Sequence, residues 1–256
     1  MKIFSRIFHR PSQTIQMELD SGGHKLPYVF RPASKAGKPL LIVLHGNGNN
    51  KIPSKFCSPE YNVLLPLDQY GIKNNGCWFL GENGDFFVFN MLKSLIHKLR
   101  ARAEIGPMLY FWGSSMGGYA ALLFALVMEG HAAFCHIPQI NLQDSSWYRK
   151  NHVFIDFIFG NDFKKHPWRN LSEMVLKHEG RMPLLFLSFN RFDRPGYIED
   201  HLLPLQKVLE QKKLNYFLQI HPQYGHANHQ SVAQHVANFK LYENEIKNNA
   251  ENIIPS

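Results

Sequence analysis

The sequence predicts an α/β fold in which helices cover both faces of a mostly parallel, doubly wound sheet. Short apolar runs that suit buried strands alternate with longer segments whose apolar residues recur every three or four positions. The chain has 256 residues, of which 45% are hydrophobic, so it can fill a large core. No repeat or low-complexity linker divides it. We therefore expect one domain over residues 1–256, with weakly structured ends at 1–13 and 243–256.

The first predicted elements form one side of the sheet. Residues 14–19 and 28–31 flank a glycine-containing turn and are predicted to pair as antiparallel strands. Residues 39–45 form a nearly continuous apolar run, which is typical of a parallel strand covered on both faces. A long loop over residues 49–75 follows, and its length is typical of a segment that overhangs a site. A short strand is predicted at 77–80.

Strands and helices then alternate to the end of the chain. Asp85 is placed to cap a helix whose apolar residues share one face, namely Phe89, Leu92, Leu95, Ile96 and Leu99. Further strands are predicted at four apolar runs: 107–112, 131–136, 184–189 and 215–221. Further helices are predicted over 116–129, over 202–209, and along a closing stripe through Val232, Val236, Phe239 and Tyr242. The stretch between residues 136 and 184 fits neither pattern.

Composition limits the class of partner and the compartment. The net charge of +8 favours anionic partners such as acidic sugars or phosphates. No basic run is interleaved with aromatic residues, so nucleic acid is not an expected partner. The three cysteines, Cys57, Cys77 and Cys135, are widely spaced and include no CxxC pair. This argues against a disulfide framework and favours a reducing compartment, so we expect a cytoplasmic location.

Membrane attachment is not a main expectation. No apolar stretch approaches the length of a membrane span, and we expect no transmembrane segment. The N-terminal segment MKIFSRIFHRPSQ lacks the continuous apolar core of a signal peptide. Its Phe4, Ile7 and Phe8 stand beside basic residues, so a peripheral membrane contact is a lesser alternative to a frayed terminus.

One short motif carries most of the functional information. Residues 113–117 read Gly-Ser-Ser-Met-Gly, a G-x-S-x-G, between a predicted buried strand and an apolar, alanine-rich helix. A strand, a tight turn and a helix in this order lift the hydroxyl of Ser115 above the sheet, and the flanking glycines avoid a collision across the turn. Ser115 is therefore the predicted nucleophile. Two alternatives stay open. Ser114, which lies off the centre of the motif, could be the nucleophile instead, or the motif could be a structural loop with no catalytic role.

A nucleophilic serine needs N–H donors for the oxyanion that forms during attack. The Met116 N–H lies at the start of the helix after Ser115, where the helix dipole favours negative charge. A second donor is expected from the loop after the strand at 39–45, which reads HGNGNN. We predict that the Asn47 N–H is this donor, with the Gly46 N–H as the second choice. The alternative is that the loop is only a polar turn at the end of a strand and takes no part in an oxyanion hole.

A serine hydroxyl also needs a base, and position must select it among fourteen histidines. The last predicted strand is followed by YGHANH, at the sheet edge where ligands bind doubly wound folds. His226 is the predicted base and His229 the second choice. A zinc site of His221, His226 and His229 is disfavoured because there is no HExxH motif and the segment crosses a strand boundary. We expect no metal and no cofactor.

The base needs a carboxylate that orients it, in the chain order serine, acid, histidine. Asp193 is the predicted acid because it lies four residues beyond the predicted strand end at Phe189. Asp162 is the rival. Glu199 and Asp200 lie nearer to the next predicted helix, where an acidic residue has the ordinary explanation of favouring a helix start.

In this order, the segments HGNG, GSSMGG, Asp193 and YGHANH resemble the α/β-hydrolase superfamily over residues 28–242. More narrowly, GSSMGGYAALLFA followed by HIPQINL, with WFLGENGD at 78–85, is similar to hydrolase-like proteins of bacterial surface-polysaccharide loci. The resemblance implies the α/β-hydrolase fold and acyl-transfer chemistry by a Ser–His–Asp triad. In some of those relatives the triad is incomplete and the role is not catalytic, whereas here all three residues are present.

The sequence thus predicts a serine hydrolase that acts on carboxylic esters of a small molecule or a glycan. The resemblance implies O-acyl groups, such as acetyl, of a bacterial surface glycan as the substrate, and the net charge allows an anionic one. Gln139 and His45 are predicted substrate contacts, with loop anchoring as the alternative for Gln139. Two other functions stay open, an acyltransferase to a sugar hydroxyl and a non-catalytic glycan-binding or assembly factor.

Overall fold

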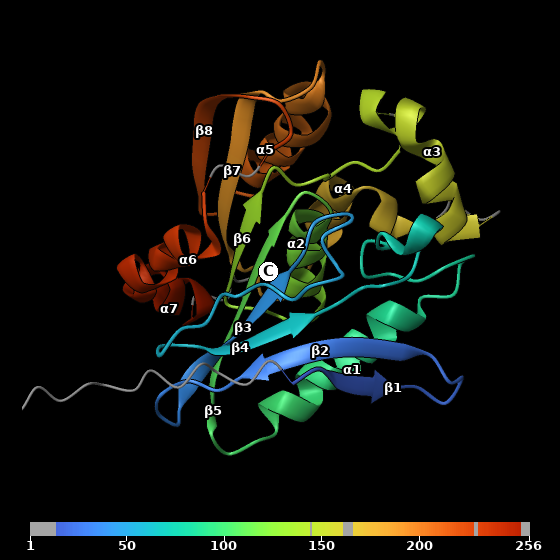
Figure 1. Ribbon diagram of the computed structural model, residues 1–256. Helices are drawn as coiled ribbons and strands as arrows, with labels where there is room; N and C mark the ends of the chain where they lie inside the picture. The colour runs from blue at the N-terminus through green and yellow to red at the C-terminus, as the bar shows by residue number, and fades with distance from the viewer. Residues whose placement is uncertain (1–13, 144, 161–165, 228–229, 252–256) are drawn as a thin grey trace, which may run out of the picture.

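The computed structural model describes residues 14–143, 145–160, 166–227 and 230–251 (Figure 1). It confirms the predicted fold class, an eight-stranded and mostly parallel sheet with helices on both faces. The strands lie in the order β1-β2-β4-β3-β5-β6-β7-β8. Their bounds are β1 Gln16–Leu19, β2 Lys25–Arg31, β3 Lys38–Leu44, β4 Asn62–Pro66, β5 Ile105–Ser114, β6 Ala132–His136, β7 Leu184–Phe192 and β8 Tyr216–Tyr224.

The direction of the strands decides where a site can form. As predicted, β1 and β2 pair antiparallel, and β2 also pairs antiparallel with β4. Every later pair, from β4 with β3 through to β7 with β8, is parallel. Since parallel strands end at the same edge of a sheet, the loops after β3, β5, β7 and β8 meet at that edge.

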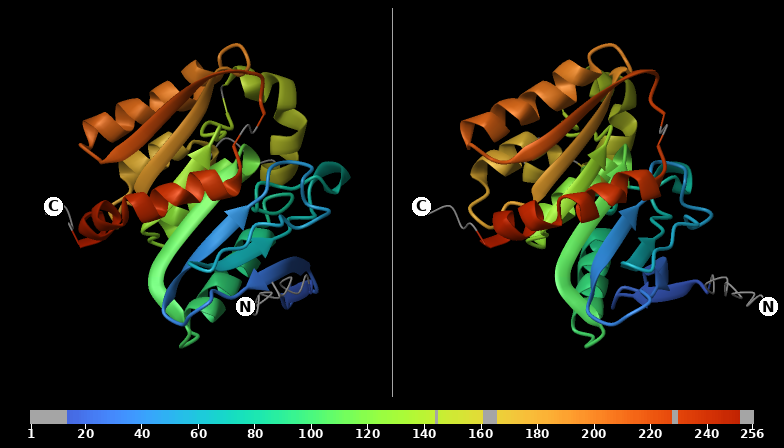
Figure 2. Two further views of the ribbon diagram at one scale, coloured as in Figure 1. Left: turned by 60° about the vertical axis from the view of Figure 1, so that its left-hand side comes forward. Right: turned by 90° about the vertical axis from the view of Figure 1, so that its left-hand side faces the viewer.

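Helices cover both faces of the sheet (Figure 2). α1, α2, α3, α4 and α5 contribute to the larger of two buried apolar clusters, and α6 and α7 contribute to the cluster on the other face. Their bounds are α1 Phe87–Arg100, α2 Met116–Val127, α3 Ser146–Phe159, α4 Leu171–Lys177, α5 Leu203–Gln211, α6 Val232–Leu241 and α7 Glu243–Glu251. The described part of the chain also contains the single-turn helices η1 Ile72–Asn74, η3 Pro167–Arg169 and η4 Ile198–Leu202.

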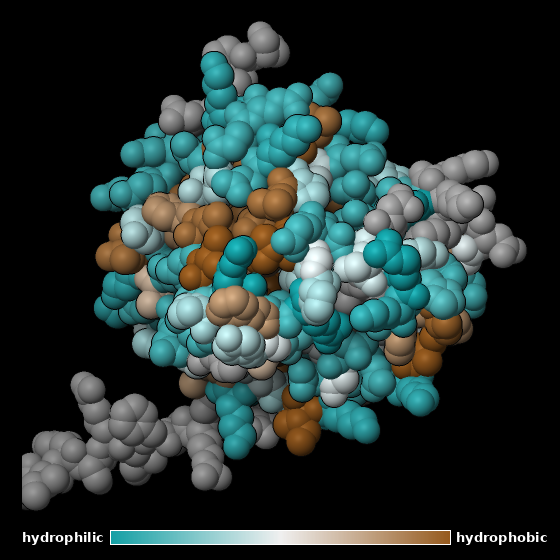
Figure 3. Space-filling model, turned by 90° about the horizontal axis from the view of Figure 1, so that it is seen from above, coloured by the Kyte–Doolittle hydropathy of each residue, from teal (hydrophilic) through white to brown (hydrophobic). Residues whose placement is uncertain are grey.

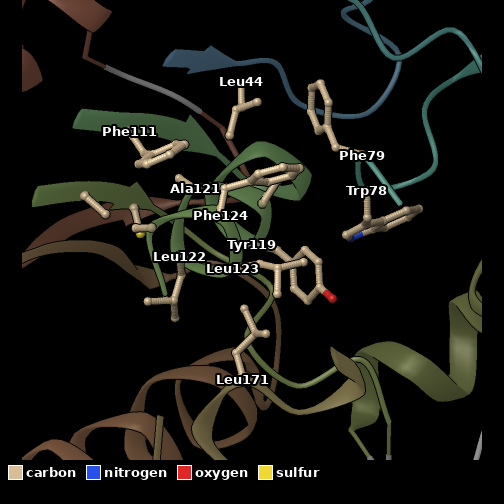
Figure 4. Close-up of a cluster of buried hydrophobic side chains, with 14 of the residues drawn as sticks. Leu44, Trp78, Phe79, Phe111, Tyr119, Ala121, Leu122, Leu123, Phe124 and Leu171 are labelled. Atoms are coloured by element: carbon tan, nitrogen blue, oxygen red, sulfur yellow. The ribbon is translucent and has the colours of Figure 1, made fainter. Parts of the chain in front are cut away.

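Helix α2 is buried on every side. All of its residues from Met116 to Leu126 are buried, as its continuous apolar sequence requires. Its leucine and phenylalanine side chains lie between Phe111 of β5 and Leu171 of α4 (Figure 4). Because such a helix cannot shift without disturbing the core, the residues at its first turn are held in fixed positions.

Two predicted elements near the sheet edge are wrong. The expected loop over 49–75 contains β4, which pairs with β2 on one side and β3 on the other. All five of its residues are buried, because apolar clusters cover both faces of the sheet there. The expected strand at 77–80 is a turn, in which Trp78 and Phe79 both have φ of 57°. The carboxylate of Asp68 holds this turn by accepting hydrogen bonds from the N–H groups of Cys77 and Phe79.

The ends of the chain and its middle also differ from expectation. Residues 243–251 form α7 where a weakly structured end was predicted, because Ile246 of this otherwise polar helix is fully buried in the core. The predicted weak ends at 1–13 and the final residues 252–256 lie outside the described residues. The stretch that fitted no pattern contains α3, η3 and α4. Along the described chain, none of the helices has the length and apolar character needed to cross a bilayer.

Candidate active site

Ser115 lies at the turn between β5 and α2, as the G-x-S-x-G motif predicts. Its backbone has φ of 57° and ψ of −118°, a conformation that is strained for any residue with a side chain. The turn depends on its glycines, because a Cβ on Gly113 would lie 1.9 Å from the carbonyl oxygen of Gly117. A Cβ on Gly117 would lie 2.2 Å from the carbonyl oxygen of Leu44 in β3. Close packing on both sides therefore sustains the strain at Ser115.

The structure brings Ser115, His226 and Asp193 together in one hydrogen-bonded row. The Nε2 atom of His226 lies 2.7 Å from the Oγ atom of Ser115, and its Nδ1 atom lies 2.8 Å from Oδ2 of Asp193. Because a carboxylate can only accept, Nδ1 carries the ring proton and Nε2 is left to accept the serine hydroxyl. The Asp193 side chain is fully buried, which keeps water away from this pair. The arrangement suits proton transfer from the serine to the imidazole.

The loop that carries His226 is fixed by a residue that the sequence analysis missed. The Nδ2 atom of Asn190, a fully buried residue of β7, donates to the carbonyl oxygens of both Gly225 and Ala227 at 3.0 Å. These two residues flank His226 in the chain. The sequence does contain a signal for this role. Asn190 ends the apolar run LLFLSFN, where a buried polar side chain is expected only if it has hydrogen-bond partners.

The ring of His226 is also held from the side. The Tyr197 ring packs against it with ring centroids 5.1 Å apart, and the Tyr197 hydroxyl donates to the Ile137 carbonyl oxygen at 2.8 Å. Tyr197 is buried, and burial raises the pKa of its hydroxyl well above the usual range. Tyr197 therefore stays uncharged and restricts the position of the imidazole by packing against it.

The predicted oxyanion donors lie around Ser115. A Cβ on Gly46 would be 3.9 Å from the Cβ of Ser115, so the HGNGNN loop passes directly beside the serine. Met116 is the first residue of α2, where an N–H has no partner inside its own helix. Among the described residues, neither the Met116 nor the Asn47 N–H meets an acceptor. Both groups are thus unoccupied main-chain donors near the hydroxyl.

His45 lines the same cavity, and its ring nitrogens both bond to the main chain. The Asp68 N–H donates to Nε2 at 2.9 Å, which leaves Nδ1 as the donor to the Gly46 carbonyl oxygen, also at 2.9 Å. Burial lowers the pKa of His45, which favours this neutral form. Both ring nitrogens thus have main-chain partners, so the predicted substrate contact of His45, which stays a prediction, would involve the carbon atoms of its ring.

Gln139, the other predicted substrate contact, is anchored at one end. It is almost fully buried, and its Oε1 atom accepts a hydrogen bond of 2.7 Å from the indole nitrogen of Trp78. Because an indole N–H can only donate, this bond fixes which end of the amide is the oxygen. Trp78 in turn belongs to the turn held by Asp68. Gln139 thus ties the segment after β6 to this turn.

These residues surround a cavity of about 680 Å³ at the carboxyl edge of the sheet. Residues from the expected overhanging loop line it, among them Asn49 and Ile52. Its lining includes Lys51 and Arg194 but no aspartate or glutamate from the described residues. The cavity therefore presents positive charge and amide groups next to Ser115.

Three histidines, of which His136 and His235 are buried and His221 is half-buried, lie on neighbouring elements near the site. Ser188 of β7 links His136 and His221, with its Oγ atom 3.0 Å from His136 Nδ1 and 3.1 Å from His221 Nε2. His235 of α6 accepts from the Trp112 indole at 3.1 Å. Burial lowers the pKa of His136 to about 3 and that of His235 to about 4, so both are neutral. Within the described residues, no three histidine, cysteine or acidic side chains are arranged to hold a metal ion.

Two of the alternative residues lie outside the described residues, namely His229 as a base and Asp162 as an acid. Asp200 is used elsewhere, because its Oδ2 atom accepts from the Ser146 N–H at the start of α3 at 2.7 Å. Ser114 ends β5 beside Ser115 and also lines the cavity.

Comparison with solved structures identifies the fold. Over 92% of its length the chain superposes on a Pyrococcus horikoshii acylaminoacyl peptidase, with a TM-score of 0.68 and 14% identity. Over 93% it superposes on a brefeldin A esterase described as a bacterial homologue of human hormone-sensitive lipase, with a TM-score of 0.59 and 14% identity. The chain has the α/β-hydrolase fold. It spans 42% of the peptidase and 75% of the esterase.

A third solved structure with this α/β-hydrolase fold is the capsule O-acetyltransferase of Neisseria meningitidis serogroup A. The two chains are 17% identical and superpose with a TM-score of 0.63, over 93% of this chain and 98% of the other. No family model matches the chain, and no curated protein matches its sequence. At these identities the likeness concerns the fold, so the chemistry must be argued from the site.

Proposed function

We propose that this α/β-hydrolase chain is a serine hydrolase of carboxylic esters. Ser115 is the nucleophile, His226 the general base and Asp193 the residue that orients the base. The observation that carries the proposal is the 2.7 Å contact of Ser115 Oγ with His226 Nε2, together with the 2.8 Å contact of His226 with Asp193. A serine on a strained turn, a correctly protonated imidazole and a buried carboxylate are the parts that this chemistry needs.

In the first half of the reaction, His226 takes the proton of Ser115 while the serine oxygen attacks the ester carbonyl carbon. The N–H groups of Met116 and Asn47, with Gly46 as the alternative to Asn47, stabilise the resulting oxyanion. The carbon–oxygen bond to the alcohol then breaks, and the alcohol leaves with the proton from His226. In the second half, His226 deprotonates a water that attacks the acyl carbon. The bond from this carbon to Ser115 Oγ then breaks, the proton on His226 returns to Oγ, and the acid is released.

The proposed substrate is an O-acyl ester, such as an acetyl ester, on a bacterial surface glycan. Amide groups and the cations of Lys51 and Arg194 line the cavity, which suits a hydroxyl-rich and anionic molecule. Because Trp78 fixes the oxygen of Gln139, the –NH2 group of this amide is the part that donates to the substrate. The fold shared with a capsule O-acetyltransferase supports a glycan as the molecule that carries the acyl group.

Acyl transfer to a sugar hydroxyl is the second candidate. The specific observation in its favour is that the likeness to the capsule O-acetyltransferase spans 98% of that chain. The same acyl-serine would form, and a sugar hydroxyl would replace water as the acceptor. The two reactions differ only in what enters the cavity during the second half.

Fluorophosphonate labelling combined with ester turnover tests the proposal. Wild-type protein should be labelled once and should hydrolyse 4-nitrophenyl acetate, and both properties should be lost in Ser115→Ala. Ser114→Ala is the matched control and should still be labelled. Adding O-acetylated and free oligosaccharides then separates release of acetate from transfer to sugar. A folded wild-type protein that is never labelled and turns over no acyl ester, yet binds glycan, would establish the non-catalytic alternative.

A further inference from the structure

We infer that the surface beside the cavity binds the backbone of an anionic polysaccharide. The inference rests on the proposed function, because it assigns a place to the polymer whose ester reaches Ser115. The surface is made by Phe192, Tyr224, Arg191 and Arg194, and we call it the rim platform.

The centre of the rim platform is a pair of stacked aromatic rings. The ring centroids of Phe192 and Tyr224 are 4.6 Å apart and their planes are inclined by 16°. Phe192 is 47% exposed and Tyr224 is 77% exposed, although large aromatic side chains are normally buried. A pyranose ring has an apolar C–H face, and an exposed aromatic ring is the surface on which that face packs.

The place of this pair links it to the proposed chemistry. Phe192 and Tyr224 pair at the ends of β7 and β8. Phe192 directly precedes Asp193, and Tyr224 lies two residues before His226. The Gly225 N–H donates to the Phe192 carbonyl oxygen at 2.8 Å, which fixes the two loops to each other. A sugar chain that packs on the aromatic pair would thus lie next to Asp193 and His226, close to the cavity.

The charges favour an anionic chain over a neutral one. Arg191 and Arg194 are exposed, and both line a hollow of about 360 Å³ beside Phe192. Arg194 also lines the main cavity, so it joins the two spaces. Neither guanidinium is paired with a described carboxylate. The hollow has two acidic residues, of which Asp193 is buried against His226 and Glu199 is exposed.

Seen from above, the molecule carries an area of apolar side chains that is surrounded by hydrophilic ones (Figure 3). Lys51 also lines the main cavity, so this space holds a second cation besides Arg194. The exposed aromatic pair and these cations match the two components of an acidic polysaccharide, its sugar rings and its anionic groups.

Binding without turnover tests the platform directly. The Ser115→Ala protein should be retarded in native gels that contain polygalacturonate or dextran sulfate, and much less in gels with neutral dextran. Adding Tyr224→Ala, or Arg191→Gln with Arg194→Gln, should reduce the retardation at least fivefold. Ile220→Ala, an exposed residue of the same strand, and Arg100→Gln, an exposed arginine at the end of α1, are the controls and should leave it unchanged.

Turnover separates substrate binding from a merely structural role of the aromatic pair. In Tyr224→Ala with an intact Ser115, kcat/KM for O-acetylated polygalacturonate should fall at least ten times more than kcat/KM for 4-nitrophenyl acetate. Equal losses for both substrates would mean that the pair only holds the strand ends together, and would overturn the inference. Added salt should raise KM for the polymer, because it screens the arginines.

The failures of the two proposals are distinguishable. Absence of fluorophosphonate labelling and of short-ester turnover defeats the proposed function, whatever the gels show. Normal short-ester turnover without retardation by either anionic polymer, or with retardation that the platform variants leave unchanged, defeats the rim platform alone. A single-stranded oligonucleotide that is bound more tightly than the polysaccharides, through the same residues, would replace the glycan by nucleic acid.

Discussion

Asn190 holds the two residues on either side of His226 with a single amide nitrogen, which lies 3.0 Å from the carbonyl oxygens of Gly225 and Ala227. The imidazole must meet Ser115 and Asp193 at the same time, and this requires a loop with little freedom. The position of the proposed base is thus set by a residue that bonds to neither Ser115 nor Asp193.

Asn190→Asp keeps the shape of the side chain but removes its hydrogen-bond donors. We expect kcat for a short ester to fall roughly 10- to 100-fold, since a misplaced base loses about 1–3 kcal/mol of transition-state stabilisation. KM should change less than kcat, and the pH profile of kcat/KM should shift. Asn62→Asp is the matched control, because Asn62 is also buried and donates to the Lys38 carbonyl oxygen far from His226. A loss of equal size in both variants would assign Asn190 to general stability.

The stability of the protein should decrease as the pH falls below about 6.5. Burial lowers the pKa of His136 to about 3 and that of His235 to about 4, whereas an unfolded histidine titrates near 6.5. Between these values the unfolded chain binds protons that the folded chain does not, so the free energy of unfolding falls by on the order of 1 kcal/mol per pH unit for each histidine. Above pH 6.5 these two residues give no slope.

Urea unfolding at a series of pH values from 7.5 to 4.5 measures this slope, which His235→Gln should reduce by the share of one histidine. A glutamine side chain can accept from the Trp112 indole as His235 does. His97→Gln on the exposed side of α1 is the control and should leave the slope as it is. A pH-independent unfolding midpoint in the wild type would contradict the burial of these neutral rings.

Gly117 should not tolerate even an added methyl group. In Gly117→Ala the Cβ would lie 2.2 Å from the Leu44 and 2.7 Å from the His45 carbonyl oxygen, and backbone atoms of a central strand cannot move aside. We expect a loss of about 3 kcal/mol in the free energy of unfolding, together with loss of fluorophosphonate labelling. Gly23→Ala, where a Cβ meets no atom within 4 Å and only the φ of 83° opposes it, should lose about 1 kcal/mol and keep the labelling.

Asp68 should be the most sensitive acidic residue outside the Ser115 row. Asp68→Ala leaves the buried N–H groups of Cys77 and Phe79 without an acceptor, and each such group costs about 1–3 kcal/mol. The turn that carries Trp78 should loosen, so the indole would no longer fix Gln139. Thermal unfolding and the KM of a glycan ester measure the two effects. Glu60→Ala, whose partner is the surface Lys38, serves as the control and should change the unfolding temperature little.

The sequence predicted the fold class because the evidence for it is local. Apolar runs, the strand–helix context of Ser115 and the glycines around it all lie within short windows. It also predicted which side chains meet, since Asp193 and His226 both follow strand ends that a parallel sheet brings to one edge. The catalytic roles of these residues, including the oxyanion donors, stay predictions.

What the sequence did not predict depends on contacts between distant segments. β4 is a strand because it lies between β2 and β3, and the surrounding loop-like composition hides it. The segment at 77–80 has a strand-like composition, but the carboxylate of Asp68 folds it into a turn. Asn190 and the ring of His45 are polar groups whose partners become apparent only in three dimensions. In each of these cases the environment of the residue is set by tertiary structure.

The pairing of Phe192 with Tyr224 has a consequence for how such a site can diverge. Asp193 and His226 follow this last pair of residues in the ladder between β7 and β8, so the two strands set the distance between them. The segment 137–183, which supplies Gln139 and Phe154 to the cavity, does not belong to the paired ends of β7 and β8. Its length and sequence can therefore change what the cavity accepts while Asp193 and His226, the proposed acid and base, keep their separation. In engineering a new substrate preference, the segment 137–183 is therefore the part to vary, and the ends of β7 and β8 are the part to keep.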